Sequence, residues 1–362
     1  MKRIVLVALS DLAHDQRMTR IASSLKAGGY DVLLVGKKVR GSLPLLDAAY
    51  QQRRISCIFS TGKIYYFEFN VKLFFFLLFQ RMHCICAVDL DTIVTAYWIS
   101  RIKSCERIYD AHEFFTEQKE VLQRPAIRRF WKRIESFSVP RFKFGYTVSE
   151  SIADAFAQQY GAKYEVIRNL PWISVEPIVE PKQKVFIYQG SINEGRGLEY
   201  LLNAAPEIPA PIWLYGDGNF RQTLELLITQ MGLENRMVMK GKLRPGELKK
   251  ICPVFYAGLN LVEPFGLNQY YSLANKFFDY IQAGIPQVTM NFPEYAAINR
   301  EYEVAVLIDD LAPHTISEAM NRLLTDQALY QRLKNNCVLA RENLNWESEE
   351  KKLLAFYSKI LK

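Results

Sequence analysis

Short apolar segments alternate with segments of helical spacing along most of this chain. Residues 3–9 are apolar and of strand length, residues 18–27 have helical spacing, and residues 31–35 are apolar again. Gly28-Gly29 ends the helical segment. Strand, helix and strand in this order form a βαβ unit, in which the two strands are parallel and the helix crosses between them. The pattern predicts an α/β protein built on parallel sheets.

A second series of the same kind begins near residue 184. Strand-like and helical segments alternate there over residues 185–188, 197–205, 211–215, 258–262, 275–283 and 287–290. Between the two series, residues 169–182 contain three prolines, which is typical of a linker. We predict two doubly wound domains, 1–170 and 171–345, and a closing helix at about 346–362. Ligands bind beyond the carboxyl ends of strands in such sheets, so we expect a cleft where these ends face each other.

Composition excludes several classes of protein. Of the 362 residues, 49% are hydrophobic and 23% charged, as in a globular protein and unlike a disordered, collagen-like or coiled-coil chain. The longest strongly apolar run, residues 73–79, is far shorter than the roughly 20 residues of a membrane-spanning helix. We expect no signal peptide, and the six scattered cysteines are typical of reduced thiols, so we expect a cytoplasmic protein.

Positive charge is concentrated in the first half of the chain. Residues 1–170 hold 26 Lys and Arg against 16 Asp and Glu, whereas residues 171–362 hold 20 against 22. The first half is therefore expected to meet an anionic partner, such as a membrane surface, a phosphorylated acceptor or a nucleic acid.

A basic amphipathic helix is predicted over residues 126–137. Its apolar side chains, with Phe130 and Trp131 among them, share one helical face, and its basic side chains lie mostly elsewhere, namely Arg128, Arg129, Lys132 and Arg133. Such a helix suits an anionic membrane surface. A packed helix with a solvated basic face is an equally open interpretation.

A glycine-rich loop follows the first strand of the second series. It reads Tyr188-Gln189-Gly190-Ser191-Ile192-Asn193-Glu194-Gly195-Arg196-Gly197 and precedes a helical segment. Glycine lets the backbone approach a ligand closely, and the N–H groups of a helix N-terminus attract phosphate. Arg196 can pair with the same anion. The loop predicts a phosphate site, although a turn that merely needs glycine has the same pattern.

Three further motifs follow strands or begin a helix in this half. Gly216-Asp217-Gly218 ends one predicted strand and Lys240-Gly241-Lys242-Leu243 ends the next. The segment Ser272-Leu273-Ala274-Asn275-Lys276-Phe277-Phe278-Asp279-Tyr280 reads as a helix start with Ser272 as its cap. Lys276 and Asp279 share one face of that helix, where a lysine suits a diphosphate and a carboxylate suits ribose hydroxyls. The alternative is a surface ion pair between the two.

These motifs, followed by Ala283-Gly284-Ile285-Pro286, resemble in order and spacing the retaining glycosyltransferases of family 4, of the bacterial type. Asp15-Gln16-Arg17, Asp89-Leu90-Asp91, Tyr109-Asp110-Ala111-His112-Glu113 and Thr147-Val148-Ser149-Glu150 are similar to the family's landmarks in the first half. The resemblance covers nearly the whole chain. It implies the GT-B architecture, two Rossmann-like domains facing across a cleft, with the final helix crossing back onto the first domain.

The resemblance also implies roles for single residues. Asp279 stands where a glutamate of the family binds the donor ribose, Arg196 where a basic residue meets the phosphates, and His112 where a histidine approaches the transferred sugar. The expected catalytic residues are His112, Arg196 and Lys276; the donor-binding residues are Gly190, Ser191, Gly216, Gly241, Lys242, Leu243, Ser272, Asn275 and Asp279; and the acceptor-side residues are Asp15, Arg17, Asp89, Asp91 and Glu113. Two positions depart from the family: Tyr271 stands in place of a first glutamate and Ser191 in place of an arginine.

The residues of the first half leave two alternatives open. Asp89-Leu90-Asp91 spells the D-x-D of metal-dependent sugar transferases, but it lies away from the predicted diphosphate. We therefore expect no metal, and no cofactor besides a nucleotide-sugar co-substrate. His112 has a structural alternative as the partner of Asp110.

We predict a metal-independent, retaining glycosyltransferase of the hexosyltransferase type that acts in cell-surface polysaccharide biosynthesis. Its donor is a nucleoside-diphosphate sugar, its acceptor a lipid-linked or polysaccharide-building molecule, and its place the cytoplasm or the inner membrane face; no nucleic acid partner is expected. A nucleotide-sugar epimerase of the same architecture and a non-catalytic anion-binding protein are the alternatives. The sequence leaves the donor base, the sugar, the acceptor and the linkage open.

Overall fold

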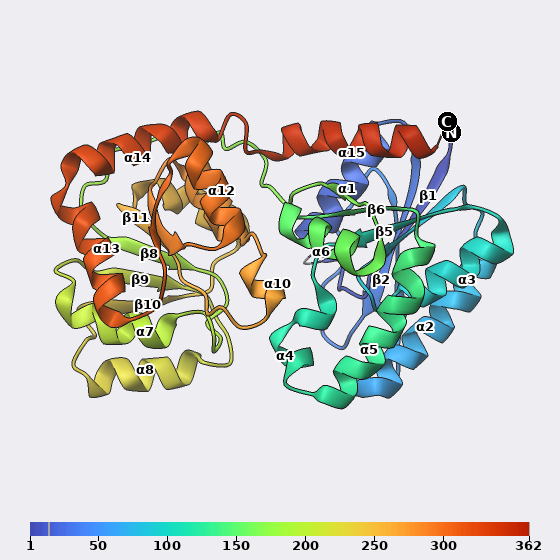
Figure 1. The fold of residues 1–362 in the computed structure, drawn as a ribbon, viewed down its shortest axis with the longest axis horizontal. Helices are drawn as coiled ribbons and strands as arrows, with labels where there is room; N and C mark the ends of the chain where they lie inside the picture. The colour runs from blue at the N-terminus through green and yellow to red at the C-terminus, as the bar shows by residue number, and fades with distance from the viewer. Residues whose placement is uncertain (14, 362) are drawn as a thin grey trace. The chain divides into compact units, whose positions relative to one another are not determined.

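The chain is organised into two compact units, each with its own parallel sheet (Figure 1). The computed structural model describes residues 1–13 and 15–361. Unit 1 contains Met1–Asn169, Gly266–Asn268 and residues 349–361, and unit 2 contains Leu170–Phe265 and Gln269–Ser348. The chain passes from unit 1 to unit 2 within the proline-containing stretch at 169–182.

The sheet of unit 1 has seven parallel strands in the order β3-β2-β1-β4-β5-β6-β7. The strands are β1 (Arg3–Val7), β2 (Asp31–Lys38), β3 (Gln51–Ser56), β4 (Cys84–Val88), β5 (Glu106–Ala111), β6 (Phe144–Thr147) and β7 (Glu165–Val166). Every residue of β4 is buried, because helices cover both faces of a parallel sheet. The strand order reverses between β1 and β4, and such a reversal is where doubly wound folds bind ligands.

The helices of unit 1 fall into two groups. They are α1 (Gln16–Ala27), α2 (Gly62–Leu78), α3 (Ile93–Lys103), α4 (Lys119–Leu122), α5 (Pro125–Ser138) and α6 (Glu150–Tyr160), with short 3₁₀ turns at Phe115–Glu117 and Val139–Arg141. The crossover through α1 runs along the sheet in the opposite direction to those through α2, α3 and α5. Because such crossovers are right-handed, α2, α3 and α5 share the face of the sheet opposite to α1.

The closing helix α15 (Trp346–Ile360) completes unit 1 with most of its length. Its Phe356 and Tyr357 lie against Tyr146 of β6, with ring centroids 5.3 Å and 6.4 Å apart. Both side chains are buried. This helix therefore contributes core side chains to a unit whose other elements come from the opposite end of the chain.

The sheet of unit 2 has six parallel strands in the order β10-β9-β8-β11-β12-β13. The strands are β8 (Phe186–Gln189), β9 (Ile212–Tyr215), β10 (Met237–Gly241), β11 (Ala257–Asn260), β12 (Gln287–Met290) and β13 (Ala305–Ile308). Alternate residues of β8 enter two different cores, Phe186 and Tyr188 on one face and Ile187 on the other. The order reverses between β8 and β11.

Helices cover this second sheet as well. They are α7 (Leu198–Ala204), α8 (Arg221–Gln230), α9 (Pro245–Ile251), α10 (Leu267–Tyr270), α11 (Asn275–Ala283), α12 (Pro293–Tyr302), α13 (Pro313–Thr325) and α14 (Gln327–Ala340), with 3₁₀ turns at Ala205–Glu207 and Cys252–Val254. The predicted class, α/β with two doubly wound parallel sheets, is confirmed. The predicted bounds of α11 and β12 are those of the structure.

Candidate donor and catalytic sites

The predicted donor motifs of unit 2 meet at the carboxyl edge of its sheet. The loop after β8 is joined to the strand end of β9 by a hydrogen bond from the Gly190 N–H to the Tyr215 carbonyl (3.0 Å), and the loop after β9 is joined to β10 by one from the Gly216 N–H to the Gly241 carbonyl (2.9 Å). The loop after β8 and the start of α11 thus flank the point where the strand order reverses. This is the expected ligand position of a doubly wound sheet.

Two glycines of these loops are required, Gly216 by close packing and Gly190 by its backbone conformation. A Cβ added at Gly216 would stand 1.8 Å from the Gly190 carbonyl oxygen, so no other residue fits at position 216. Gly190 has a φ of 131°, which disfavours other residues. A Cβ there would lie 3.8 Å from the Nζ atom of Lys276, which is an ordinary contact distance. The backbone conformation, and not lack of space, therefore favours glycine at 190, and the loop lies beside the lysine.

Lys276 has a buried amino group without a partner in the part of the chain that the structure describes. Its Nζ atom is buried, has no hydrogen-bond partner among the described residues, and lies 3.7 Å from the centre of the Tyr188 ring. Burial, and secondarily the charge of Arg196, hold the pKa of Lys276 well below its ordinary value. No hydrogen bond or ion pair engages Arg196 within the described part of the chain. Two neighbouring cationic side chains without a carboxylate partner are the makings of an anion site.

Asp279 does not form the surface ion pair with Lys276 that the sequence left open. One turn further along α11, its Oδ2 atom accepts a hydrogen bond of 2.8 Å from the side-chain amide of Gln189, the last residue of β8. Gln189 is buried, and its own Oε1 atom has no partner among the described residues. Gln189 and Tyr188 belong to the loop motif in the sequence, but the motif by itself predicts no role for either residue. Their position at a strand end before a glycine was the available signal.

The remaining donor-side residues differ in their contacts and in their exposure. Ser272 was predicted to cap the helix, and this was wrong: the cap position belongs to Ala274, and the Ser272 hydroxyl donates to the Gln269 carbonyl (2.8 Å). The Ser272 hydroxyl is engaged by this carbonyl three residues earlier in the chain, so it does not cap α11. Leu243 packs into the smaller core, whereas Ser191, Lys242 and Asn275 are exposed.

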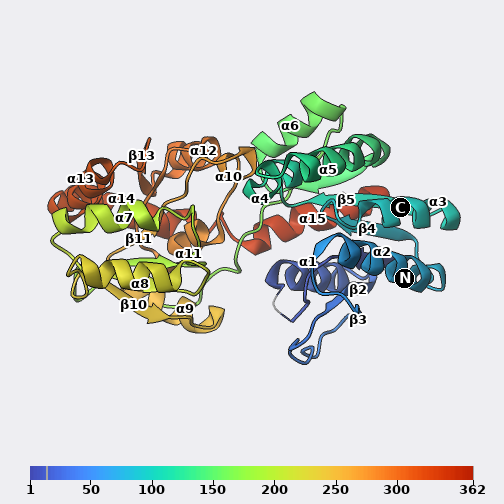
Figure 2. The same cartoon turned by 90° about the horizontal axis from the view of Figure 1, so that it is seen from below.

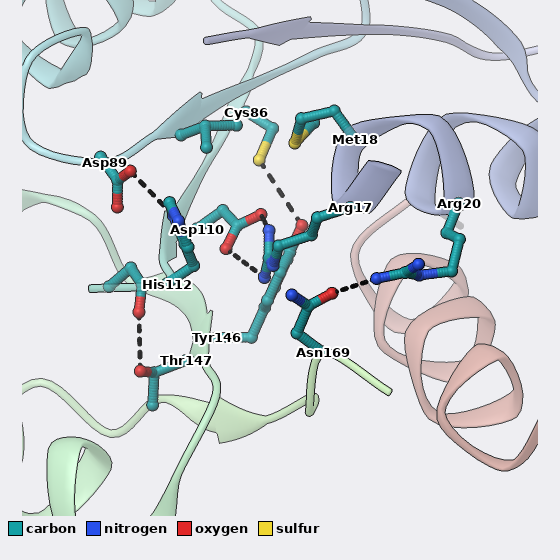
Figure 3. A network of polar contacts seen from close by, with 12 residues as sticks. Arg17, Met18, Arg20, Cys86, Asp89, Asp110, His112, Tyr146, Thr147 and Asn169 are labelled. Atoms are coloured by element: carbon teal, nitrogen blue, oxygen red, sulfur yellow. Dashed lines mark hydrogen bonds and ion pairs between the residues drawn. The ribbon is translucent and has the colours of Figure 1, made fainter. Parts of the chain in front are cut away.

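In unit 1, Arg17 and Asp110 form a buried, two-pronged ion pair. Each guanidinium Nη atom of Arg17 donates to one carboxylate oxygen of Asp110, as Figure 3 shows, and the second of these hydrogen bonds measures 2.7 Å. Arg17 is 7% exposed and Asp110 is fully buried. Asp110 raises the pKa of Arg17 against the opposing effect of burial. The pair joins α1 to β5, and both groups are occupied by it.

His112 is paired with Asp89 and not with Asp110. Its Nδ1 atom lies 2.8 Å from Asp89 Oδ2 (Figure 3). The structural alternative that named Asp110 as its partner was therefore wrong, because Arg17 takes both oxygens of that carboxylate. Burial by itself lowers the pKa of His112, but the charge of Asp89 and the hydrogen bond to Asp89 together outweigh burial and raise the pKa to about 9. His112 is a third exposed, so a charged imidazolium is presented at the surface of unit 1.

Asp89 stands in an unusual backbone conformation at the end of β4. Its φ is 56°, a left-handed conformation that is uncommon for residues with a side chain. Its N–H donates to the Asp110 carbonyl (2.9 Å), which fixes the turn. Such strain is often found at functional sites. It places the Asp89 carboxylate beside His112, at the strand-order reversal of unit 1.

The other acceptor-side residues surround this pair or support it. Burial, and then the charge of Asp89, raise the pKa of Asp91 well above its ordinary value. Burial likewise raises the pKa of Glu113, which accepts a hydrogen bond from the Gln118 amide. Asp15 caps α1 by accepting from the Met18 N–H (2.9 Å). Asp15 and Arg17 thus have structural contacts, and contact with an acceptor stays a prediction for all five residues.

The described residues contain no cluster of three or more His, Cys, Asp or Glu side chains arranged to hold a metal ion. The six cysteines are free thiols.

A comparison of families assigns the second half of the chain. Residues 173–337 match the family described as "Glycosyl transferases group 1". This stretch is therefore similar to a glycosyltransferase group 1 domain, and it contains every donor-side residue predicted above.

A curated relative agrees with this assignment. It is an uncharacterized glycosyltransferase of Methanocaldococcus jannaschii, 25% identical to this chain over 190 residues, which cover 49% of this chain and 46% of the relative. The match thus spans about half the length of each protein.

Solved structures share the fold over the whole chain. A sucrose-phosphate synthase from Thermosynechococcus elongatus superposes with a TM-score of 0.84 at 14% identity and covers 99% of both chains. HepE of Anabaena, solved in complex with UDP, superposes with a TM-score of 0.77 at 14% identity and covers 99% of this chain and 100% of its own. At these identities the likeness shows the fold, which is of the GT-B class.

Proposed function

We propose that this protein transfers a sugar from a nucleoside-diphosphate sugar to a lipid-linked or saccharide acceptor, with retention of configuration and without a metal ion. The observation that carries the proposal is the pair Lys276 and Arg196, two cations without a carboxylate partner beside the glycine loop of a glycosyltransferase group 1 domain. The complex of HepE with UDP supports a nucleotide donor in this fold.

The chemistry asked of unit 2 is stabilisation of a leaving group. When the bond between the sugar and the diphosphate breaks, negative charge grows on the diphosphate oxygens. Cations that already stand at this position lower the barrier, since they gain most from the charge that develops in the transition state. Lys276 and Arg196 perform this task in our proposal, and Asp279, held by Gln189, accepts hydrogen bonds from the ribose hydroxyls.

The chemistry asked of unit 1 is supplied by the pair Asp89 and His112. An imidazolium that is stabilised by a carboxylate can donate a hydrogen bond to a sugar hydroxyl. In our proposal His112 contacts the transferred sugar, and Asp89 orients the imidazole of His112 and stabilises its protonated form. The acceptor meets this unit, whose residues 1–170 carry the excess of positive charge.

We propose that the reaction belongs to the building of cell-surface polysaccharide at the inner face of a membrane. The free thiols of the described residues are compatible with a reducing compartment. The transferred group in this proposal is a hexose.

The test is a two-stage assay of the full chain. A thermal-shift screen against nucleoside diphosphates and their sugars first finds the donor, since a ligand of the folded state raises the melting temperature. Products are then analysed with and without saccharide and lipid-linked acceptors, in excess EDTA. We expect acceptor-dependent transfer with the anomeric configuration retained and the rate unchanged by the chelator.

Other outcomes assign other functions. Interconversion of the donor sugar without an acceptor would make the protein an epimerase. Nucleotide binding without any turnover would make it a binding protein. Activity that EDTA abolishes and magnesium or manganese restores would overturn the metal-independent mechanism and direct attention to Asp89 and Asp91.

A further inference from the structure

Helix α2 has apolar side chains on two opposite sides. Tyr65, Phe69, Leu73 and Leu77, four residues apart, are buried against unit 1. A second apolar stripe with similar spacing is exposed, comprising Ile64, Phe67, Val71, Phe75 and Phe79. Phe67 is 72% exposed. Of the apolar run 73–79, Leu73 and Leu77 belong to the buried stripe, and Phe75 and Phe79 to the exposed one. An amphipathic surface helix presents polar residues to water, so this exposed stripe indicates a surface that something covers.

The loop before α2 adds to this apolar surface in a fixed conformation. Glu68 accepts hydrogen bonds from the backbone N–H groups of Ile58 (2.8 Å) and Phe59 (3.0 Å). The side chains of Ile58 and Phe59 are both exposed. Since the backbone that carries them is tied to α2, their exposure is built into the structure.

The neighbouring helices present further apolar side chains. Helix α2 packs beside α3, and α3 beside α5, on one face of the sheet (Figure 2). Aromatic contacts join the three helices: Tyr66 lies 5.6 Å from Trp131, and Tyr97 lies 5.5 Å from Phe137, between ring centroids. The exposed large apolar side chains of α3 and α5 are Trp98, Ile102, Phe130 and Phe137.

Positive charge accompanies these apolar side chains. Helices α2, α3 and α5 hold eight Lys and Arg against two Glu. Both glutamates form ion pairs within unit 1, Glu68 with Lys72 and Glu135 with Lys132. Four exposed cations make no ion pair or hydrogen bond with the described residues, namely Lys63, Arg101, Arg129 and Arg133. The three helices thus offer apolar groups together with uncompensated positive charge.

We propose that α2, α3 and α5 form the docking surface of this protein for an anionic lipid bilayer. The exposed aromatic side chains enter the interfacial layer, and the free cations meet the anionic headgroups. Charge decides between this occupant and a second copy of the chain, because two such faces would bring like charges together. No helix within the described residues is long and apolar enough to cross a membrane, so the contact is peripheral.

The docking surface differs from the sequence prediction in its main element. The sequence directed attention to the basic helix at 126–137, whose attraction to an anionic surface by charge would be screened by salt. The structure adds the apolar stripe of α2, whose contribution does not depend on salt. We therefore infer that high salt weakens vesicle binding but does not abolish it.

The test is co-sedimentation of the full chain with vesicles of phosphatidylcholine, with and without one third phosphatidylglycerol, at low and high salt. We expect Phe67→Gln/Phe75→Gln to lower the partition coefficient by about tenfold or more at both salt concentrations, because two large apolar groups no longer enter the bilayer. Arg129→Gln/Arg133→Gln should lower it by a similar factor at low salt only. The matched control is Leu226→Gln/Leu339→Gln, which replaces two exposed apolar residues of unit 2.

A native fluorophore gives a second measurement. Trp98 is 50% exposed on α3, so lipids with brominated acyl chains should quench part of the tryptophan emission, and Trp98→Phe should remove that quenching. Wild-type protein that stays in the supernatant with anionic vesicles at low salt would overturn the proposal. So would equal partitioning of the Phe67/Phe75 variant and the wild type, or self-association that this variant alone abolishes.

The outcome is independent of the proposed transfer reaction. The docking surface lies in unit 1 and nucleotide affinity is measured on unit 2, so each can fail without the other. Calorimetry with a nucleoside diphosphate, in the absence of lipid, should give the same affinity for the Phe67/Phe75 variant and the wild type.

Discussion

At the scale of single residues, the two units handle buried charge in opposite ways. Asp110 pairs with Arg17 through both carboxylate oxygens, whereas Lys276 lies beside another cation with no carboxylate partner. A buried charge costs free energy unless it is paired. The Arg17 pair therefore belongs to the architecture of unit 1, and Lys276 is poised for an anion that arrives from outside.

Removal of either cation should weaken donor binding. A charge-assisted hydrogen bond to phosphate contributes about 1.5–3 kcal/mol, so Lys276→Ala and Arg196→Ala should each lower nucleoside-diphosphate affinity by about tenfold or more. Isothermal calorimetry measures the affinity, and Lys249→Ala, an exposed lysine of unit 2, is the control. Unchanged affinity in both variants would mean that the donor binds elsewhere.

Donor binding should take up a proton. In the free protein, burial and Arg196 lower the pKa of Lys276, and a bound diphosphate raises it again. Between the two pKa values, binding protonates the amine, so affinity falls as pH rises through that range. Calorimetry in buffers of different ionisation enthalpy gives the number of protons, and Lys276→Met should remove the uptake. Equal proton uptake in this variant would assign it to another group.

Asp89 should control the protonation of His112. With Asp89 present, the pKa of His112 is raised to about 9; in Asp89→Asn the effect of burial remains and the pKa should fall to about 6.5 or below. The pair with Asp89 stabilises the folded protein fully at pH values below the pKa of His112 in the unfolded chain. This stabilisation is lost as the pH rises through about 9, the pKa in the folded protein. Proton NMR of the imidazole, assigned with His112→Gln, follows both variants. A pKa that does not move would show that the ion pair is absent in solution.

At the scale of elements, α5 shows why a run of basic residues is not one functional group. Arg128 pairs with Glu117 (2.7 Å), and Lys132 pairs with Glu135 (2.8 Å), a buried carboxylate that also accepts from Thr116 and Tyr160. Arg129 and Arg133, each next in sequence to one of these paired residues, are exposed. Only these last two are available to an external surface without loss of a contact inside unit 1.

The two kinds of basic residue on α5 should respond differently to substitution. Lys132→Gln removes the positive partner of the buried Glu135 carboxylate. It should destabilise the protein by about 1–2 kcal/mol, a value reduced because Lys132 is partly exposed. Arg133→Gln should change stability by less than about 0.5 kcal/mol. Thermal unfolding at neutral pH compares them. Equal melting temperatures would show that the other partners of Glu135 suffice.

At the scale of the whole molecule, the chain returns at its end to the unit it began. Helix α15 places Leu353, Phe356 and Tyr357 in the core of unit 1, so the stability of this unit depends on residues almost 200 positions after its last strand. Deletion of a large buried side chain costs transfer free energy and leaves a cavity.

Phe356→Ala should therefore destabilise unit 1 selectively. We expect a loss of about 3–5 kcal/mol, seen as an earlier unfolding transition, with the nucleotide affinity of unit 2 retained at low temperature. Lys351→Ala, on the exposed side of the same helix, should leave the transition in place. A Phe356→Ala protein with an unaltered transition would contradict the role of α15 in this core.

The sequence by itself determined the class of fold and the places where polar residues gather. Apolar periodicity and glycine positions depend on local backbone geometry, so they predicted helix α11 and strand β12 with their bounds, and they put the Gly190 loop and Lys276 at the edge of one sheet. The sequence did not predict which residues far apart in the chain pair with each other. That Arg17 takes Asp110 and leaves Asp89 to His112, that Gln189 takes Asp279, and that one stripe of α2 lies outside the core were decided by the tertiary structure. Each of these depends on which groups compete for the same partner in space, and a linear pattern does not contain that information.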